Sequence, residues 1–94
     1  MEIFIAAKNS SIAAKVTDHR TDPAKIVIKA KHPEVGSVLA IAAGVNPAEI
    51  ETTKGSVYFL TFLPRAAFVA GFGKAMSDVL AGNIAIATCA AVPR

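Results

Sequence analysis

The chain is short of charge, and this shortage limits what kind of protein it can be. Charged residues make up 18% of its 94 residues, against a typical share of about 25%, while apolar residues make up 53%. A domain of this length buries only about two-thirds of the surface that its unfolded chain exposes, so its own core cannot hide that much apolar surface. We therefore expect one domain that buries its remaining apolar surface in a homo-oligomer.

A long hydrophobic run is also missing. The longest stretch without charge, residues 79–93, is shorter than the roughly 18 apolar residues of a membrane-spanning helix, and Gly82 and Asn83 interrupt it. At the N-terminus, Glu2 stands where a secretory signal peptide carries a positive residue. These features predict a cytoplasmic protein without a membrane partner.

The chain offers little material for catalysis. Its single cysteine, Cys89, excludes an internal disulfide framework. The histidines His19 and His32 lie in or beside predicted loops, and neither has a metal-binding spacing with the other or with Cys89. The stretch Gly-Phe-Gly-Lys at residues 71–74 lacks the spacing of a phosphate-binding loop and lies inside a predicted helix. Because no nucleophile–base pair emerges either, we expect a protein that is not an enzyme.

Hydrophobic periodicity and turn residues divide the chain into strands and two helices. Ile26, Ile28 and Ala30 alternate with other residues, as in a strand, and Pro33 and Pro64 suit the first turns of helices. The pattern predicts strands over residues 2–7, 25–31, 48–53, 56–63 and 84–91, and helices over residues 33–44 and 65–81, with residues 11–17 left as a strand or an irregular arm.

This order predicts an α/β (α+β) fold. After an N-terminal β arm over residues 1–23, residues 24–94 read as β-α-β-β-α-β, which is a ferredoxin-like, or split βαβ, layout. We expect a single sheet with both helices on one face.

The predicted second helix carries few charged side chains and many small ones. Gly71 and Gly73 each cost a helix about 1 kcal/mol relative to alanine, so we expect close packing to offset that cost. Charge is scarce in this half of the chain, because only four charged residues follow Gly55. We therefore expect the second half to be the most buried part, in part by other copies of the chain.

The basic residues of the first third raise the question of nucleic acid. Lys25, Lys29 and Lys31 lie close together, but the net charge of +3 is mild and no aromatic residues are interleaved with these lysines. A surface for single-stranded nucleic acid combines the two kinds of side chain. We therefore expect a solvated strand face and no nucleic-acid partner. The alternative is a nucleic-acid-binding module that uses these lysines.

Short motifs at both ends of the chain resemble one family. Ala-Thr-Cys at residues 87–89 resembles the Thr-Thr-Cys-Pro near the C-terminus of circularly permuted bacterial microcompartment shell proteins, found in ethanolamine, propanediol and glycyl-radical compartments. Residues 3–9 and 12–14 resemble the N-terminal segment of the same proteins, and the predicted element order over residues 24–91 agrees. The chain departs from the family at Ala90, where the family has proline.

The resemblance implies a structural role. The protein would be a subunit of a hexameric tile with a central pore, in the shell of a cytoplasmic microcompartment. The N-terminal arm would cap the pore as part of a small barrel. Its partners would be further copies, other shell proteins and the encapsulated enzymes. The alternative is an oligomeric ferredoxin-like regulator that binds a small molecule between subunits.

Cys89 is the candidate site residue, for a cofactor and for a metal. It is either a small apolar residue on a buried strand or one of a ring of thiolates around the pore. The resemblance to glycyl-radical members implies that such a ring would hold an iron–sulfur cluster for electron transfer. Both interpretations stay open at this point.

Overall fold

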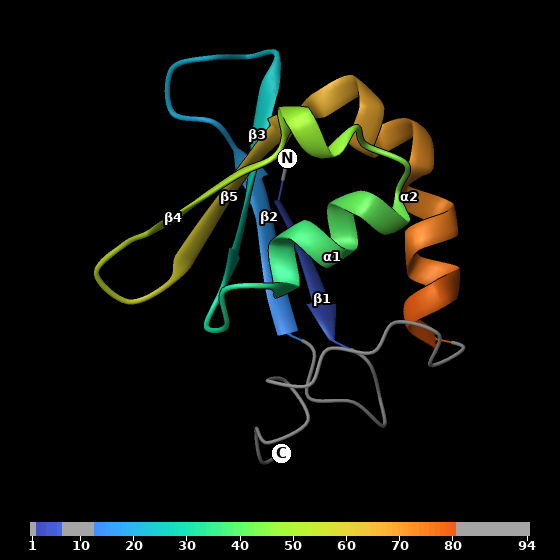
Figure 1. The fold of residues 1–94 in the computed structure, drawn as a ribbon, viewed down its shortest axis with the longest axis horizontal. Helices are drawn as coiled ribbons and strands as arrows, with labels where there is room; N and C mark the ends of the chain where they lie inside the picture. Colours follow the sequence, from blue (N-terminus) through green and yellow to red (C-terminus); the bar gives the residue numbers. More distant parts are fainter. Residues whose placement is uncertain (1, 7–12, 81–94) are drawn as a thin grey trace.

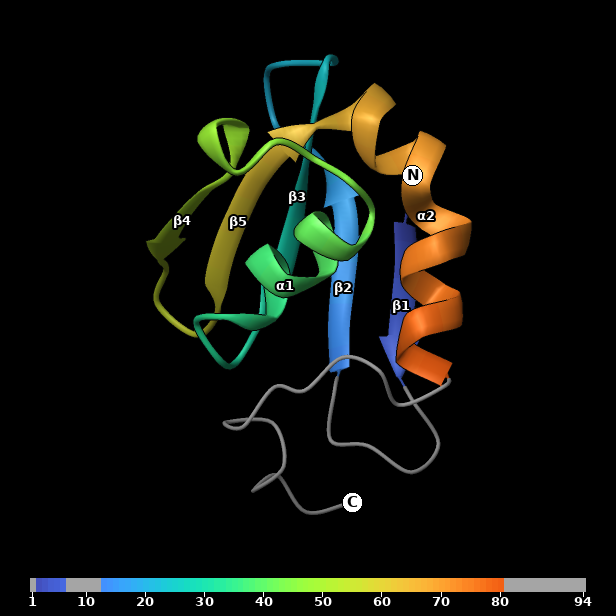
Figure 2. The same cartoon turned by 45° about the vertical axis from the view of Figure 1, so that its right-hand side comes forward.

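The computed structural model describes residues 2–6 and 13–80, which form one antiparallel sheet with two α-helices packed on one of its faces (Figure 1; Figure 2). The strands are β1 (Glu2–Ala6), β2 (Ala13–Asp18), β3 (Lys25–Ala30), β4 (Glu51–Lys54) and β5 (Phe59–Pro64), and the helices are α1 (Val35–Ala42) and α2 (Arg65–Leu80), with a short 3-10 turn at Pro47–Glu49. The predicted α+β class, the single sheet and the placement of both helices on one face are confirmed. The predicted strand over residues 84–91 lies outside the described residues.

The strand order is β1-β2-β3-β5-β4, and every neighbouring pair is antiparallel. The part β3-β5-β4 agrees with the split βαβ layout, because β5 lies between the two strands that α1 connects. In a ferredoxin-like sheet, the strand after the second helix lies on the other side of β3. Here β2 occupies that place, with Val16 opposite Ile28. The order is therefore not clearly ferredoxin-like.

The N-terminal segment belongs to the same sheet as the rest of the described chain. The predicted arm over residues 1–23 contributes β1 and β2, and β2 pairs with β3 from Lys15 to Asp18. A short loop between β2 and β3 keeps these strands adjacent, as in most hairpins. The described part of the arm thus extends the sheet that carries the helices.

Local capping explains where the middle elements begin and end. Gly44 follows α1 with a φ of 89°, a left-handed conformation that glycine adopts without steric cost, so the predicted helix end is confirmed. The side chain of Asn46 accepts a hydrogen bond from the backbone N–H of Ala48 at 3.0 Å. This bond caps the 3-10 turn, so β4 begins at Glu51 rather than at residue 48 as predicted.

The core lies between the sheet and the two helices. On α2, Phe68 and Ala75 are buried and Phe72 and Met76 pack against the core, so these four residues form an apolar stripe at helical spacing. The rings of Phe68 and Phe72 meet edge to face, with centroids 5.6 Å apart. The largest fully buried side chains are those of Val16, Ile26, Ile28, Val35, Leu39, Thr61, Leu63 and Phe68.

Gly71 marks the closest approach of the two helices. A Cβ atom at this position would lie 1.6 Å from the carbonyl oxygen of Ala43, which directly follows α1. A Cβ atom at Gly73 would meet nothing within 4 Å. The expected packing role is therefore confirmed for Gly71, but Gly73 has no such contact within the described chain.

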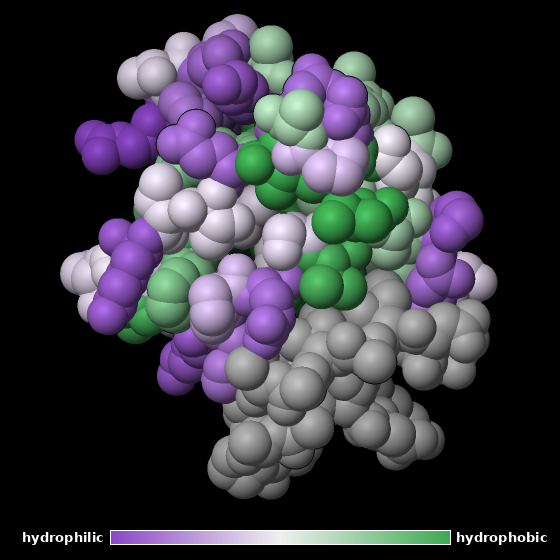
Figure 3. All heavy atoms as spheres, in the orientation of Figure 1, coloured by the Kyte–Doolittle hydropathy of each residue, from purple (hydrophilic) through white to green (hydrophobic). Residues whose placement is uncertain are grey.

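No described element covers the outer surface of the helical layer. Figure 3 shows this side, with apolar residues gathered over its centre and hydrophilic residues around much of its rim. Ile41 on α1 and Val69 on α2 are each 52% exposed, and Ala66 and Ala70 are exposed as well. Most of the buried residues of the described chain precede Gly55, but residues 81–94 of the second half lie outside the described residues, so the expected burial of that half stays a prediction. Burial by other copies stays a prediction.

Candidate functional site

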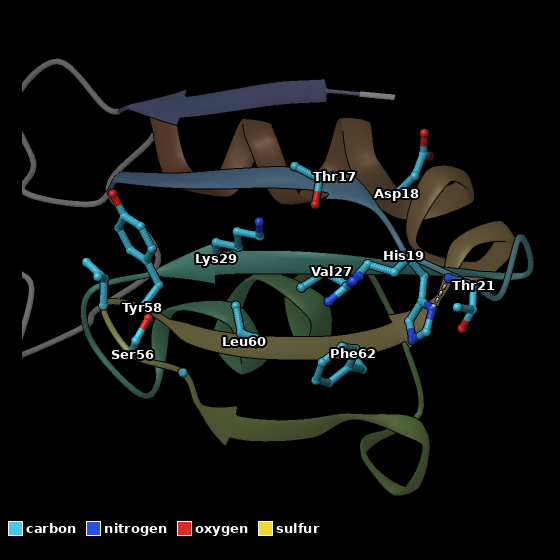
Figure 4. A pocket seen from close by; sticks show the side chains of 13 residues that line it. Thr17, Asp18, His19, Thr21, Val27, Lys29, Ser56, Tyr58, Leu60 and Phe62 are labelled. Carbon is cyan, nitrogen blue, oxygen red and sulfur yellow. Dashed lines mark hydrogen bonds between the residues drawn. The ribbon is translucent and has the colours of Figure 1, made fainter.

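The face of the sheet opposite to the helices has no described element over it. Figure 4 shows it from this side, with the strands in front and the helices behind them. Successive side chains of a strand point to opposite faces, so the residues that alternate with the core residues lie here. We call this surface the open face. Across β2, β3, β5 and β4 it presents one row of Thr17, Val27, Phe62 and Glu51 and a second row of Lys15, Lys29, Leu60 and Thr53.

The open face is hollowed between two loops. The hollow has a volume of about 710 Å³, a size typical of ligand sites, and is open to solvent rather than enclosed. Its floor is apolar, formed by Val27, Leu60 and Phe62. One wall is the end of β2 with the loop after it, and the other is the loop between β4 and β5; together they contribute Asp18, His19, Arg20, Thr21, Gly55, Ser56, Val57 and Tyr58.

Aromatic rings stand at both ends of the hollow. His19 and Phe62 lie together at one end, and Tyr58 lies at the other, where its ring leans across β3 toward β2 (Figure 4). The rings of His19 and Phe62 meet edge to face, with centroids 5.5 Å apart. Four residue steps of extended chain separate Tyr58 from Phe62, which is about 13 Å at about 3.3 Å per residue. The open face therefore carries two separated aromatic surfaces.

The loop that holds His19 is tied down by hydrogen bonds. The backbone N–H groups of Thr21 and Asp22 both donate to Nδ1 of His19, at 3.1 and 3.0 Å. Because Nδ1 accepts these bonds, the proton of the neutral ring resides on Nε2. On the other side of the loop, Nε of Arg65 donates to the carbonyl oxygen of Pro23 at 2.9 Å. These bonds fix the position of the His19 ring at the end of the hollow.

The charged residues that line the hollows of the open face are mostly basic. A neighbouring hollow of about 410 Å³ shares Lys29 and Tyr58 with the first, and four basic residues line the two hollows: Lys15, Arg20, Lys29 and Lys31. The Nζ atom of Lys15 lies 5.5 Å from the centroid of the Phe4 ring, within the range of a cation–π contact. Positive charge and aromatic surface thus adjoin on this face.

Among the described residues that line these hollows, one is acidic, Asp18, and it already has an ion-pair partner. Its carboxylate forms an ion pair with the guanidinium group of Arg65. Hydrogen bonding and nearby positive charge hold the pKa of the Asp18 carboxyl below its usual value, and Arg65 contributes to both. Asp18 is therefore ionised at neutral pH, and Arg65 offsets part of its charge.

The structure brings some of the singled-out residues together and separates others. Lys29 and Lys31 line the hollows, whereas Lys25 is exposed at the start of β3. His32 lies apart from this face, in the turn before α1, where its Nε2 atom is buried without a hydrogen-bond partner in the described chain. Cys89, the candidate cluster ligand, lies outside the described residues. Within residues 2–6 and 13–80, no three His, Cys, Asp or Glu side chains gather closely enough to hold a metal ion.

The sequence interpretation missed the aromatic part of this site. The aromatic residues of this face, Phe4, Tyr58 and Phe62, are far along the chain from the lysines that line the hollows. They come close to these lysines in space because β1 pairs with β2 and β5 pairs with β3. The available signal was the alternation in β5, where Leu60 and Phe62 fall on the face opposite to Thr61 and Leu63. A strand of consecutive apolar residues is usually buried on both faces, whereas Leu60 and Phe62 are only half-buried on the open face.

Two further findings bear on what the chain does. Neither α1 nor α2, the two α-helices of the described segments, is long and apolar enough to cross a bilayer. The chain matches no family model, no curated protein and no solved structure.

Proposed function

We propose that the protein is a binding module for single-stranded nucleic acid, and that the strand lies along the open face between the His19 loop and the loop that carries Tyr58. The observation that supports this proposal most directly is the arrangement of side chains on that face. Aromatic rings and basic side chains line the same two hollows there, above an apolar floor.

The aromatic rings supply the surface for bases. Bases stack on exposed aromatic side chains with little dependence on sequence, and each such contact contributes about 1–3 kcal/mol to binding. Tyr58 and Phe62 are the stacking residues in this proposal. Leu60 lies between them on the floor of the hollow and offers an apolar surface for a base or a sugar.

The basic residues supply the contacts to phosphate. Lys15, Lys29, Lys31 and Arg20 border the same hollows, while the one acidic lining residue is paired with Arg65. Four phosphate contacts to a single strand give a salt dependence with a slope of about −2.8, which corresponds to about a 50-fold loss of affinity between 50 and 200 mM salt. The proposal therefore predicts moderate but clearly salt-dependent binding.

This proposal differs from the expectation that the sequence alone supports. That expectation of no nucleic-acid partner rested on lysines without interleaved aromatic residues. In the folded sheet, β5 and the loop before it bring Phe62 and Tyr58 to the same hollow as Lys29, with Leu60 directly opposite Lys29 and Phe62 opposite Val27. The reason for setting nucleic acid aside no longer applies.

The test is a titration with fluorescein-labelled 12-nucleotide oligo-dT and oligo-U, followed by fluorescence anisotropy at several salt concentrations. Phe62→Ala and Tyr58→Ala should each weaken binding about 5- to 140-fold, the equivalent of one lost stack. Lys29→Ala should also reduce the salt slope by about 0.7. Thermal unfolding of each variant checks that the fold is intact.

Matched controls lie on the helical side. The side chain of Lys74 on α2 is 72% exposed. Lys74→Ala removes one positive charge, as Lys29→Ala does. Ile41→Ala removes an exposed apolar side chain of α1. Both variants should bind like the unaltered protein. Absence of binding at 50 mM salt, or equal losses for Lys74→Ala and Lys29→Ala, would contradict the proposal.

The exposed apolar surface of the helical layer favours a second candidate, the hexameric shell subunit. Ile41 and Val69 have no covering element among the described residues, and subunit contacts would bury them. Light scattering distinguishes a hexamer from a monomer or a dimer, because six chains of 9.7 kDa weigh about 58 kDa. Cys89→Ser and an iron assay on anaerobically prepared protein then test the cluster. A colourless preparation without iron would remove that part of the proposal.

A further inference from the structure

We propose that β1 pairs antiparallel with β1 of a second copy of this chain, so that two sheets join edge to edge into one sheet of ten strands. The interaction surface consists of the outer edge of β1, with which no other described strand pairs, and the outer surface of α2, which we define as Ala66, Val69 and Ala70. The inference does not depend on the proposed nucleic-acid function.

The two edges of the sheet differ in a way that favours this contact. β4 forms one edge, and all four of its residues are exposed, including the charged Glu51 and Lys54. Charged side chains on an edge strand discourage pairing with another strand. β1 forms the other edge, with the sequence Glu-Ile-Phe-Ile-Ala, and Phe4 at its centre is 75% exposed. Of the two edges, only the β1 edge has an apolar row of this kind.

The sequence of β1 is complementary to itself. A two-fold axis through Phe4 places Ile3 of one copy opposite Ile5 of the other, and Glu2 opposite Ala6. No like charges then face each other across the new strand pair, and the two Phe4 rings become neighbours on the open face. Because the same patch is used by both copies, the contact closes as a symmetric dimer.

The second part of the surface lies on the same side of the domain. Figure 2 shows α2 beside β1, with α1 further toward the middle of the sheet. The side of α2 that packs on α1 carries Phe68 and Gly71, so the outer surface of α2 points away from α1 and beyond the β1 edge. Val69 on that surface is 52% exposed. A second copy joined at β1 would bring its own α2 against these small side chains, which allow helices to approach closely.

The first experiment is light scattering during size-exclusion chromatography from 1 to 100 µM protein. The expected particle has twice the chain mass of 9.7 kDa, which is 19.4 kDa. Phe4→Lys and Val69→Lys should each convert it to a monomer, because they place like charges at the axis or between the two helices. Val57→Lys is the matched control, since Val57 is 66% exposed in the loop between β4 and β5, away from the β1 edge. Circular dichroism and thermal unfolding check that each variant is folded.

The second experiment tests the strand register with a disulfide. In a Cys89→Ser background, Phe4→Cys should form a cross-linked dimer under mild oxidation, because directly opposed antiparallel residues lie at about the Cα separation that a disulfide needs. Val57→Cys should not cross-link. A 58 kDa particle in which Phe4→Cys cross-links into pairs would also support the inference.

Three results would overturn it. A monomer at 100 µM would remove the dimer. A dimer that survives both Phe4→Lys and Val69→Lys would have another interface. A dimer that Val69→Lys dissociates, but that Phe4→Cys does not cross-link, would be held by helices without strand pairing.

Discussion

Gly71 and Gly73 lie two residues apart on α2, and the structure assigns opposite effects to the same substitution at these positions. A Cβ atom at Gly71 would lie 1.6 Å from the carbonyl oxygen of Ala43 and 2.5 Å from its carbonyl carbon. A Cβ atom at Gly73 would enter open space. We therefore expect Gly71→Ala to destabilise the fold and Gly73→Ala to stabilise it.

The magnitudes follow from two opposing contributions. Alanine is favoured over glycine in a helix interior by about 1 kcal/mol, and this gain applies to both variants. At Gly71 the new methyl group must move about 1.8 Å to reach an ordinary contact of 3.4 Å, and its neighbour is backbone, so α1 and α2 must separate. Overpacking costs typically about 1–3 kcal/mol, and a rigid backbone neighbour places this case near 3 kcal/mol. The net loss for Gly71→Ala is then about 2 kcal/mol.

Urea and thermal unfolding followed by circular dichroism measure both effects. For a domain of this size, 1 kcal/mol corresponds to a Tm change of about 4–8 °C. Gly71→Ala should therefore lower the Tm by about 8–16 °C, and Gly73→Ala should raise it by about 4–8 °C. A Gly71→Ala variant as stable as the unaltered protein would refute the close approach of α2 to the end of α1.

Two further predictions concern hydrogen bonds of single side chains. The Thr61 hydroxyl is buried and lies 2.9 Å from the Thr52 hydroxyl, so Thr61→Val, which keeps the shape of the side chain, should lower the free energy of unfolding by about 1 kcal/mol. Urea unfolding of Thr61→Val, Thr52→Val and the double variant measures this coupling, and additive losses would show that the bond contributes nothing. His19→Ala removes the acceptor of two backbone N–H groups, so the amide protons of Thr21 and Asp22 should exchange faster with deuterium while those of β3 do not. Unchanged exchange at these two positions would contradict the role assigned to the His19 ring.

The proposals about function have distinguishable outcomes. Binding of oligonucleotides depends on Tyr58, Phe62 and Lys29, whereas dimer formation depends on Phe4 and Val69. A protein that dimerises through β1 but does not bind oligonucleotides would leave the edge pairing intact and remove the nucleic-acid function. A monomer that binds oligonucleotides in a salt-dependent way would do the reverse.

Local features of the sequence determined the identity of most elements. Alternation of Ile26, Ile28 and Ala30 with other residues identified β3, and helical spacing identified the buried stripe of α2 that contains Phe68 and Ala75. The end of α1 at Gly44 also followed from the sequence, because glycine adopts the left-handed conformation without steric cost. Each of these signals depends on a residue and its near neighbours, which is why no tertiary information was needed.

Only the tertiary structure decided which strands lie side by side and which side chains therefore meet. Residues 13–18 have a weak strand pattern, yet β2 takes the place beside β3, because a short loop returns the chain and Val16 is fully buried there. The same pairing brings Lys15 to Lys29 and Leu60, and the loop after β4 adds Tyr58. Periodicity assigns a residue to a face of its own strand, but the choice of neighbouring strand depends on burial and loop closure summed over the whole domain. The open face was therefore present in the sequence as separate strands and became a site only when the sheet assembled.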